Sequence, residues 1–211
     1  WQGPFKGEGT LPLHGYRRRL AKVEDNVLTD DACERFFTML SESERPLIYA
    51  GGGVINGNAT KPMRRLANEY GIPVTTTLMA LGASDTTHPL ALHMLGMHGL
   101  ASANYAVEDC DFLIAVGARF DDRVAGNPNQ FAPRAKNIAH FDVDFAEIGK
   151  VKRVNWHQVG MLERDLTDLL AYGRRIGFKK TFDSWQAEIA QLKEKHCLNY
   201  DRESEMIQPY A

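Results

Sequence analysis

The sequence is poor in cysteine and has no long apolar run. Its three cysteines, Cys33, Cys110 and Cys197, lie far apart and form no CxxC pair. This scatter excludes a zinc ribbon and indicates reduced thiols in a cytosolic protein. Every apolar run is far shorter than the roughly 20 residues needed to span a bilayer. No signal or transit peptide is recognisable, so we expect a cytoplasmic protein without a membrane partner.

An excess of basic residues is also absent. The formal net charge is −2, and the only basic run is the arginine triplet at residues 17–19. Such a short run is typical of a solvated linker. A chain without a positive stripe has no electrostatic field to attract a phosphate backbone. We therefore expect no nucleic-acid partner.

The motifs of several enzyme classes are missing as well. The sequence contains no P-loop, HExxH or GxSxG pattern. Its GGGVING stretch places Asn56 where a GxGxxG fingerprint needs its third glycine, so a standard NAD site is excluded. The spacing of His88, His93 and His98 would set successive rings about 140° apart on a helix. Helical metal ligands prefer i, i+4, so we predict no metal site.

The remaining composition is that of a globular protein of 211 residues, 44% hydrophobic and 25% charged. We expect one large domain with tails. Residues 1–28 are polar, glycine-rich and without a period, and are interpreted as a linker or arm. Residues 29–175 form the predicted central α/β domain, and 176–211 a C-terminal helix and linker. Because the first residue is Trp1 rather than Met, we expect a fragment of a longer chain.

Helical and strand patterns alternate along the central domain. Apolar residues at i, i+3, i+4 and i+7 predict helices, with clear examples at residues 33–40 and 63–70. Residues 82–99 are expected to be a long glycine-bearing connection. The strands lack two-residue alternation, which indicates burial on both faces. This order predicts an open, mostly parallel sheet with helices on both faces. The five predicted strands are RPLIYA, IPVTTTL, DFLIAVG, NIAHFDV and RVNWHQV.

The ends of these strands carry the candidate chemistry. An open parallel sheet binds ligands beyond the carboxyl ends of its strands. Arg119 and Arg123 can fork onto phosphate, and the adjacent Asp121 and Asp122 would orient them. Asp142 ends the next strand and suits a ribose or adenine contact. These residue types fit a dinucleotide, but a surface ion-pair network or a subunit contact at the strand end is an open alternative.

A long stretch then resembles a known family. LHMLGMHGLASANYAVEDCDFLIAVGARFDDRVAG, with PVTTTLMALG before it and AHFDVDFAEIGK after it, is similar to the catalytic subunits of acetohydroxyacid (acetolactate) synthases. The resemblance covers about residues 15–211. It implies a thiamine-diphosphate- and magnesium-dependent transferase that condenses pyruvate with a 2-ketoacid in branched-chain amino-acid biosynthesis. It also implies three α/β domains, of which the Rossmann-like middle one binds FAD.

This chain is similar to that middle domain alone. The sequence has no Gly-Asp dipeptide, so the family's metal motif is missing, and we expect the isolated chain to be catalytically inactive. Thiamine diphosphate and magnesium would be bound by the first and third domains. The resemblance also implies a homo-oligomer and a regulatory subunit as partners. Because the third domain supplies part of the flavin pocket in the family, we expect weaker FAD binding by this chain alone.

The resemblance assigns FAD contacts to residues at the strand ends. One departure is Gly160-Met161, where the family often has Gly-Asp near the adenine. In the family, the loop containing Met97 and His98 lies along the flavin. The assigned residues are Gly51, Gly52, Gly53, Thr77, Leu78, Leu95, Gly96, Met97, His98, Gly117, Ala118, Arg119, Asp121, Arg123, Val124, Asp142 and Val143.

Three alternatives remain open at this stage. The first is the same domain from another thiamine-dependent flavoprotein, glyoxylate carboligase or pyruvate oxidase. The second is an NAD-consuming deacylase of related fold, against which the scattered cysteines argue. The third is a structural domain that has lost its cofactor.

Overall fold

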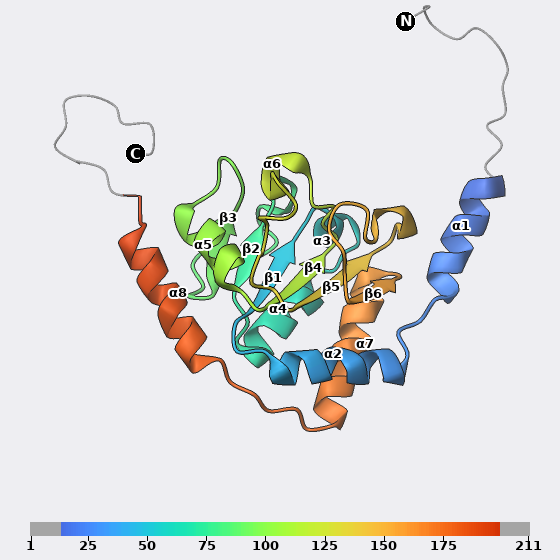
Figure 1. The fold of residues 1–211 in the computed structure, drawn as a ribbon. Helices are drawn as coiled ribbons and strands as arrows, with labels where there is room; N and C mark the ends of the chain where they lie inside the picture. Colours follow the sequence, from blue (N-terminus) through green and yellow to red (C-terminus); the bar gives the residue numbers. More distant parts are fainter. Residues whose placement is uncertain (1–13, 199–211) are drawn as a thin grey trace, which may run out of the picture.

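The protein forms one parallel sheet with helices on both faces. The computed structural model describes residues 14–198. The sheet has six strands in the order β3-β2-β1-β4-β5-β6, and every neighbouring pair is parallel. This confirms the predicted fold class (Figure 1). The strands are β1 (Pro46–Ala50), β2 (Val74–Thr76), β3 (Ala91–Met94), β4 (Phe112–Val116), β5 (Asn137–Asp142) and β6 (Trp156–Val159).

Strand β3 corrects the prediction of five strands. It lies within residues 82–99, which were expected to be a connection without a strand. Its pairing with β2 is irregular, and His93 within it has a left-handed backbone with φ of 60°. A strand of four residues with an irregular register carries too little periodicity to stand out in a sequence.

The helices surround the sheet. The crossover from β1 to β2 contains α4, and the crossover from β3 back to β4 contains α5. Right-handed crossovers that run in opposite directions place α4 and α5 on opposite faces. The helices are α1 (His14–Asp25), α2 (Asp30–Glu42), α3 (Gly53–Asn56), α4 (Thr60–Tyr70), α5 (Ala101–Asp109), α6 (Asp122–Ala125), α7 (Leu162–Arg175) and α8 (Asp183–Lys195), with short 3₁₀ turns η1 (Leu78–Ala80) and η2 (Phe145–Glu147).

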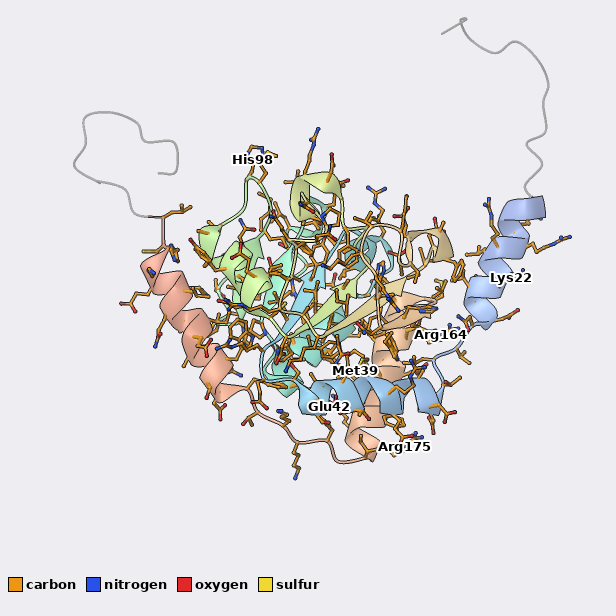
Figure 2. The ribbon with its side chains drawn as sticks, viewed as in Figure 1. Lys22, Met39, Glu42, His98, Arg164 and Arg175 are labelled. Atoms are coloured by element: carbon orange, nitrogen blue, oxygen red, sulfur yellow. The ribbon has the colours of Figure 1, made fainter. Side chains whose placement is uncertain are left out.

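Helix α1 lies in the segment where the sequence showed no period. Its connection to α2 is held to α7 by Arg164, which donates to the carbonyl of Asn26 at 2.7 Å, and to the end of β6 by the Asn26 side chain, which donates to the carbonyl of Val159 at 2.6 Å. Figure 2 shows Arg164 at this junction. Residues 1–13 of the predicted arm and residues 199–211 of the predicted C-terminal linker lie outside the described residues.

The predicted apolar stripes form the core. All four stripe residues of α2 are buried, and Phe36 packs its ring against Phe112 and Phe141 of the sheet. Phe37 packs against Tyr70 of α4 and Tyr172 of α7, so these three helices meet on one face. On the other face, α5 packs against β3 and α8. Within residues 14–198, no helix has the length and apolar character needed to cross a bilayer.

Asp165 is a buried acid at the start of α7. Its Oδ2 lies against Gly160 and has no hydrogen-bond partner among the described residues. Burial raises the pKa of the Asp165 carboxyl from 3.8 to about 6, and the positive charge of Arg164 offsets part of this effect. The folded state therefore binds the proton of Asp165 more tightly than the unfolded state does. The resulting stabilisation is fully present below the unfolded pKa and is lost as the pH rises through 6.

We therefore expect Asp165→Asn to stabilise the protein at high pH. The free energy of unfolding should rise by about 1–3 kcal/mol at pH 8 and change little at pH 4. Urea unfolding at both pH values measures this difference. Glu194→Gln, which removes an exposed carboxylate from α8, should leave both values unchanged. An equal effect of Asp165→Asn at the two pH values would contradict the account.

Candidate functional site

The candidate site is the edge of the sheet where the carboxyl ends of the strands meet. Because all six strands are parallel, the segments that follow them all leave from this edge (Figure 1). Every residue that the sequence assigned to cofactor binding lies in one of these segments. They follow β1 (residues 51–53), β2 (77–78), β3 (95–98) and β4 (117–124), and the last group comprises the final residue of β5 and the one after it (142–143). The site therefore sits at the switch between β1 and β4, where ligands of open α/β sheets bind.

Glycines allow the ends of β1 and β4 to touch. A Cβ atom on Gly51 would collide with the carbonyl of Gly117. A Cβ atom on Gly117 would lie 2.6 Å from the Cα of Gly53, and the φ of Gly117 is +56°. The N–H of Gly53 donates to the Gly117 carbonyl at 3.0 Å. Two of the three glycines after β1 are thus explained by backbone contact with Gly117, whereas Gly52 faces Met79.

The loops after β3 and β4 are bonded to each other. The N–H of Met97 donates to the carbonyl of Arg123 at 3.1 Å. A Cβ atom on Gly96 would lie 2.9 Å from the same carbonyl. Asn104 of α5 fixes the loop from behind, since its side chain accepts from the N–H of Gly96 at 2.8 Å and donates to its carbonyl at 3.0 Å. The two loops named by the sequence therefore form one wall. Figure 2 shows His98 projecting from its rim.

The two arginines of the site, Arg119 and Arg123, are exposed. Among the described residues, no ion pair joins Arg119 or Arg123 to an acid, so a surface ion-pair network does not account for this charge. The expectation that the aspartates orient the arginine side chains is wrong. Asp121 and Asp122 instead accept from the backbone N–H of Arg123 at 3.2 and 3.0 Å.

These bonds start the short helix α6. The backbone N–H of Arg123 lowers the pKa of Asp121, with help from Asp122 and the two arginine charges. Since neither carboxylate forms an ion pair with Arg119 or Arg123 among the described residues, both guanidinium groups remain available to an external anion.

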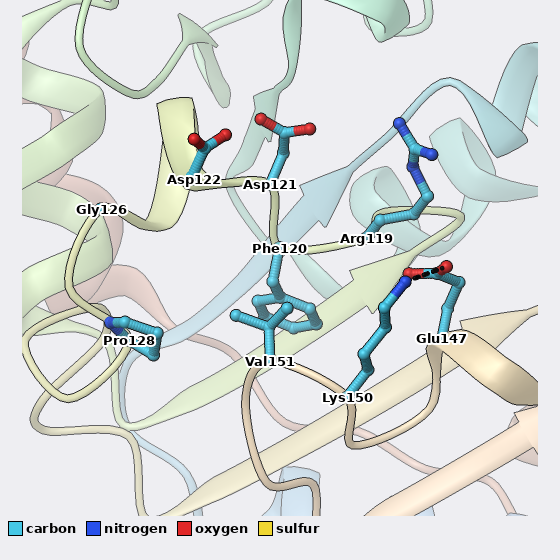
Figure 3. A pocket seen from close by; sticks show the side chains of 9 residues that line it. All are labelled: Arg119, Phe120, Asp121, Asp122, Gly126, Pro128, Glu147, Lys150 and Val151. Carbon is cyan, nitrogen blue, oxygen red and sulfur yellow. Dashed lines mark hydrogen bonds and ion pairs between the residues drawn. The ribbon is translucent and has the colours of Figure 1, made fainter.

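Phe120 connects this loop to the sheet beneath it. It has a left-handed backbone with φ of 55°, which is uncommon outside glycine. Its buried ring meets Tyr49 edge-on and forms the floor of a pocket of about 240 Å³. Figure 3 shows the Phe120 ring turned toward Val151, while the Asp121 and Asp122 carboxylates point the opposite way. The alternation places one apolar side chain inside the fold and leaves the charged neighbours at the surface.

Apolar side chains are exposed along the same edge. Leu78 is 65% exposed and Met97 is 75% exposed. Val143 and Phe145, which follow β5, are exposed as well. The hydroxyl of Thr77 is buried without a hydrogen-bond partner among the described residues. Exposed apolar groups beside free cations form a surface suited to a large amphipathic ligand or to a neighbouring domain.

The structure adds three residues that the sequence did not single out. Phe120 could have been noticed as the one apolar residue inside the charged run. Asn104 gives no local signal, because its role depends on β3 and α5 lying side by side. His140 lies on β5 under Phe120, and its burial is visible only once the strand register is known. No group of three or more His, Cys, Asp or Glu side chains within residues 14–198 is placed to hold a metal ion.

The glycine contact predicts a specific cost for a small substitution. Gly117→Ala should lose about 3–5 kcal/mol of unfolding free energy, from a left-handed alanine and a clash with Gly53. Gly149→Ala is the matched control, because Gly149 has φ of +69° and open space around the new Cβ. It should lose only about 1–2 kcal/mol. Urea unfolding measures the free energy of unfolding of both variants. Equal losses in the two variants would show that the contact between the ends of β1 and β4 does not contribute to stability.

The comparisons with known proteins agree with this architecture. Residues 33–169 match the family described as thiamine pyrophosphate enzyme, central domain. The probable acetolactate synthase large subunit of Methanocaldococcus jannaschii is 47% identical over 171 residues, which are 81% of this chain and 29% of that protein. The chloroplastic acetolactate synthases 1 of Zea mays and Nicotiana tabacum are 43% and 39% identical, over 94% and 99% of this chain and 30% of each relative.

The chain thus spans less than a third of the length of these curated relatives. The family match covers more than half of the chain, and its limits enclose the whole sheet and the candidate site. The chain belongs to the thiamine pyrophosphate enzyme family, of which it is a central domain.

Proposed function

We propose that this chain is the FAD-binding central domain of an acetolactate synthase large subunit. The observation that carries the proposal is the exposed pair Arg119 and Arg123 at the switch between β1 and β4, without a carboxylate partner among the described residues. A pyrophosphate supplies the anionic oxygens that two guanidinium groups bind best. The names of the relatives at 39–47% identity support the choice of synthase.

The other residues of the edge fit the rest of a flavin dinucleotide. Leu78 and Met97, in the loops after β2 and β3, offer exposed apolar surface against which an isoalloxazine ring can be buried. Asp142 ends β5 and offers carboxylate oxygens to ribose hydroxyls. The hydroxyl of Thr77 is available for a polar contact in the same place. The cofactor would therefore cross the edge from β2 to β5.

In the whole protein, this domain would hold the flavin beside a thiamine site built elsewhere. Thiamine diphosphate and magnesium would be bound by the flanking domains, where pyruvate is decarboxylated and joined to a second 2-ketoacid. The family resemblance implies that FAD plays no net redox part in this reaction. The residues of this chain would then bind and orient the cofactor and shield it from water. A homo-oligomer, a regulatory subunit and a cytoplasmic location belong to the same proposal, although the tobacco and maize relatives are named chloroplastic.

Titration with FAD tests the proposed site. The chain should bind FAD saturably, and Arg119→Ala should weaken binding by about 10–100-fold, because a charge-assisted hydrogen bond to phosphate is lost. Arg35→Ala is the matched control, since Arg35 is also exposed but belongs to α2, away from the loops after the strands (Figure 1). Calorimetry gives both dissociation constants. Equal weakening by the two variants, or no binding by a folded protein, would contradict the proposal.

The activity of the chain by itself gives a second test. Supplied with pyruvate, thiamine diphosphate, magnesium and FAD, it should form no acetolactate, whereas the corresponding full-length enzyme should. A colorimetric acetoin assay after acid decarboxylation measures the product. Acetolactate formed by this chain alone would show that the thiamine machinery does not reside in other domains.

A further inference from the structure

His140 is a buried imidazole beneath the candidate site. Its side chain is fully buried on β5, and neither ring nitrogen has a hydrogen-bond partner among the described residues. Buried polar groups in folded proteins almost always have a partner, so an orphaned one calls for an explanation. A residue that served only to fill the core could be apolar, as are Ala115 and Phe141 beside it.

The ring touches both of the strand ends that carry charged site residues. Phe120 meets it edge-on, with ring centroids 5.3 Å apart, and this contact supports the loop that presents Arg119. On the other side, the His140 Nε2 lies 3.6 Å from Oδ2 of Asp142. His140 therefore lies between a side chain from the end of β4 and a side chain from the end of β5, in addition to the backbone pairing of these strands.

Apart from this contact, the Asp142 carboxylate has one hydrogen bond among the described residues. Its Oδ1 accepts from the N–H of Asp144 at 2.9 Å, which leaves Oδ2 facing the imidazole. A carboxylate oxygen can accept two hydrogen bonds. An imidazole N–H on Oδ2 would fix the rotation of the carboxylate and still leave lone pairs for a ligand hydroxyl.

We propose that His140 is a positioning residue for the cofactor, acting through Asp142. Its Nε2–H donates to Oδ2 of Asp142 and holds the carboxylate in the orientation that receives a ribose hydroxyl. The contact shortens from its present 3.6 Å to hydrogen-bond length when a ligand hydroxyl approaches the same carboxylate. This inference rests on the proposed FAD site and adds the group that orients one of its acids.

The first test is a mutant cycle on FAD affinity. His140→Phe keeps a ring against Phe120 but loses the N–H, whereas His140→Gln keeps a donor near Asp142. We expect His140→Phe to weaken FAD binding about tenfold and His140→Gln to weaken it about twofold or less. In an Asp142→Asn background, His140→Phe should add less than about twofold, because the two residues act through one contact.

Trp156→Phe separates positioning from stability. Trp156 is also buried, on β6, and packs against α2 and Phe141; within residues 14–198, its ring contacts and its hydrogen bond involve no candidate site residue. The Trp156→Phe substitution should lower the free energy of unfolding without changing the affinity for FAD. If His140→Gln weakens binding as much as His140→Phe does, or if His140→Phe loses about tenfold in both backgrounds, the residue acts only through packing and the proposal is wrong.

A second measurement does not require FAD. Nitrogen-15 NMR of the ligand-free protein should show the His140 proton on Nε2, and Asp142→Asn should shift that resonance. A proton on Nδ1, or a resonance unchanged by Asp142→Asn, would overturn the positioning role even if FAD binds normally. Conversely, no FAD binding with the expected NMR signature would reject the proposed cofactor while leaving the contact between His140 and Asp142 established.

Discussion

The site depends on the backbone contact between the ends of β1 and β4. Gly51 and Gly53 approach Gly117 so closely that a single methyl group at any of the three would displace main-chain atoms. This contact brings the backbone at the ends of the two central strands together, and from there the chain diverges into α3 after β1 and toward α6 after β4. The open edge is formed by that divergence. The glycines act by shaping the scaffold, in addition to any approach that they allow to a ligand.

The surrounding loops share the same support. The loop after β3 is bonded to the carbonyl of Arg123, and Asn104 holds it from α5. The loop after β4 is anchored by the buried ring of Phe120 and by the aspartates that start α6. Both loops are therefore anchored to the rest of the domain, while their exposed side chains, such as Met97 and Arg119, face outward. A site of this kind can bind an elongated ligand at several points with little loss of conformational entropy.

Much of the fold could be predicted from the sequence, because helices α2 and α4 bury regular stripes and the central strands are uninterrupted apolar runs. Strand β3 could not, since its four residues include a left-handed His93. The candidate residues at the strand ends were identified by type and by resemblance. Their physical roles could be seen only in the structure. Asp121 and Asp122 accept from a backbone N–H rather than from an arginine side chain. The position of His140 under Phe120 follows from the strand register, which the sequence does not give.

Hydrogen exchange with and without FAD tests the central claim most directly. If the cofactor lies across the edge of the sheet, FAD should slow amide exchange in residues 95–99 and 119–126 together, because one ligand covers both loops. The face formed by α2, α4 and α7 should exchange at the same rate in both samples. Protection confined to that face, or unchanged exchange in both loops at saturating FAD, would contradict the account.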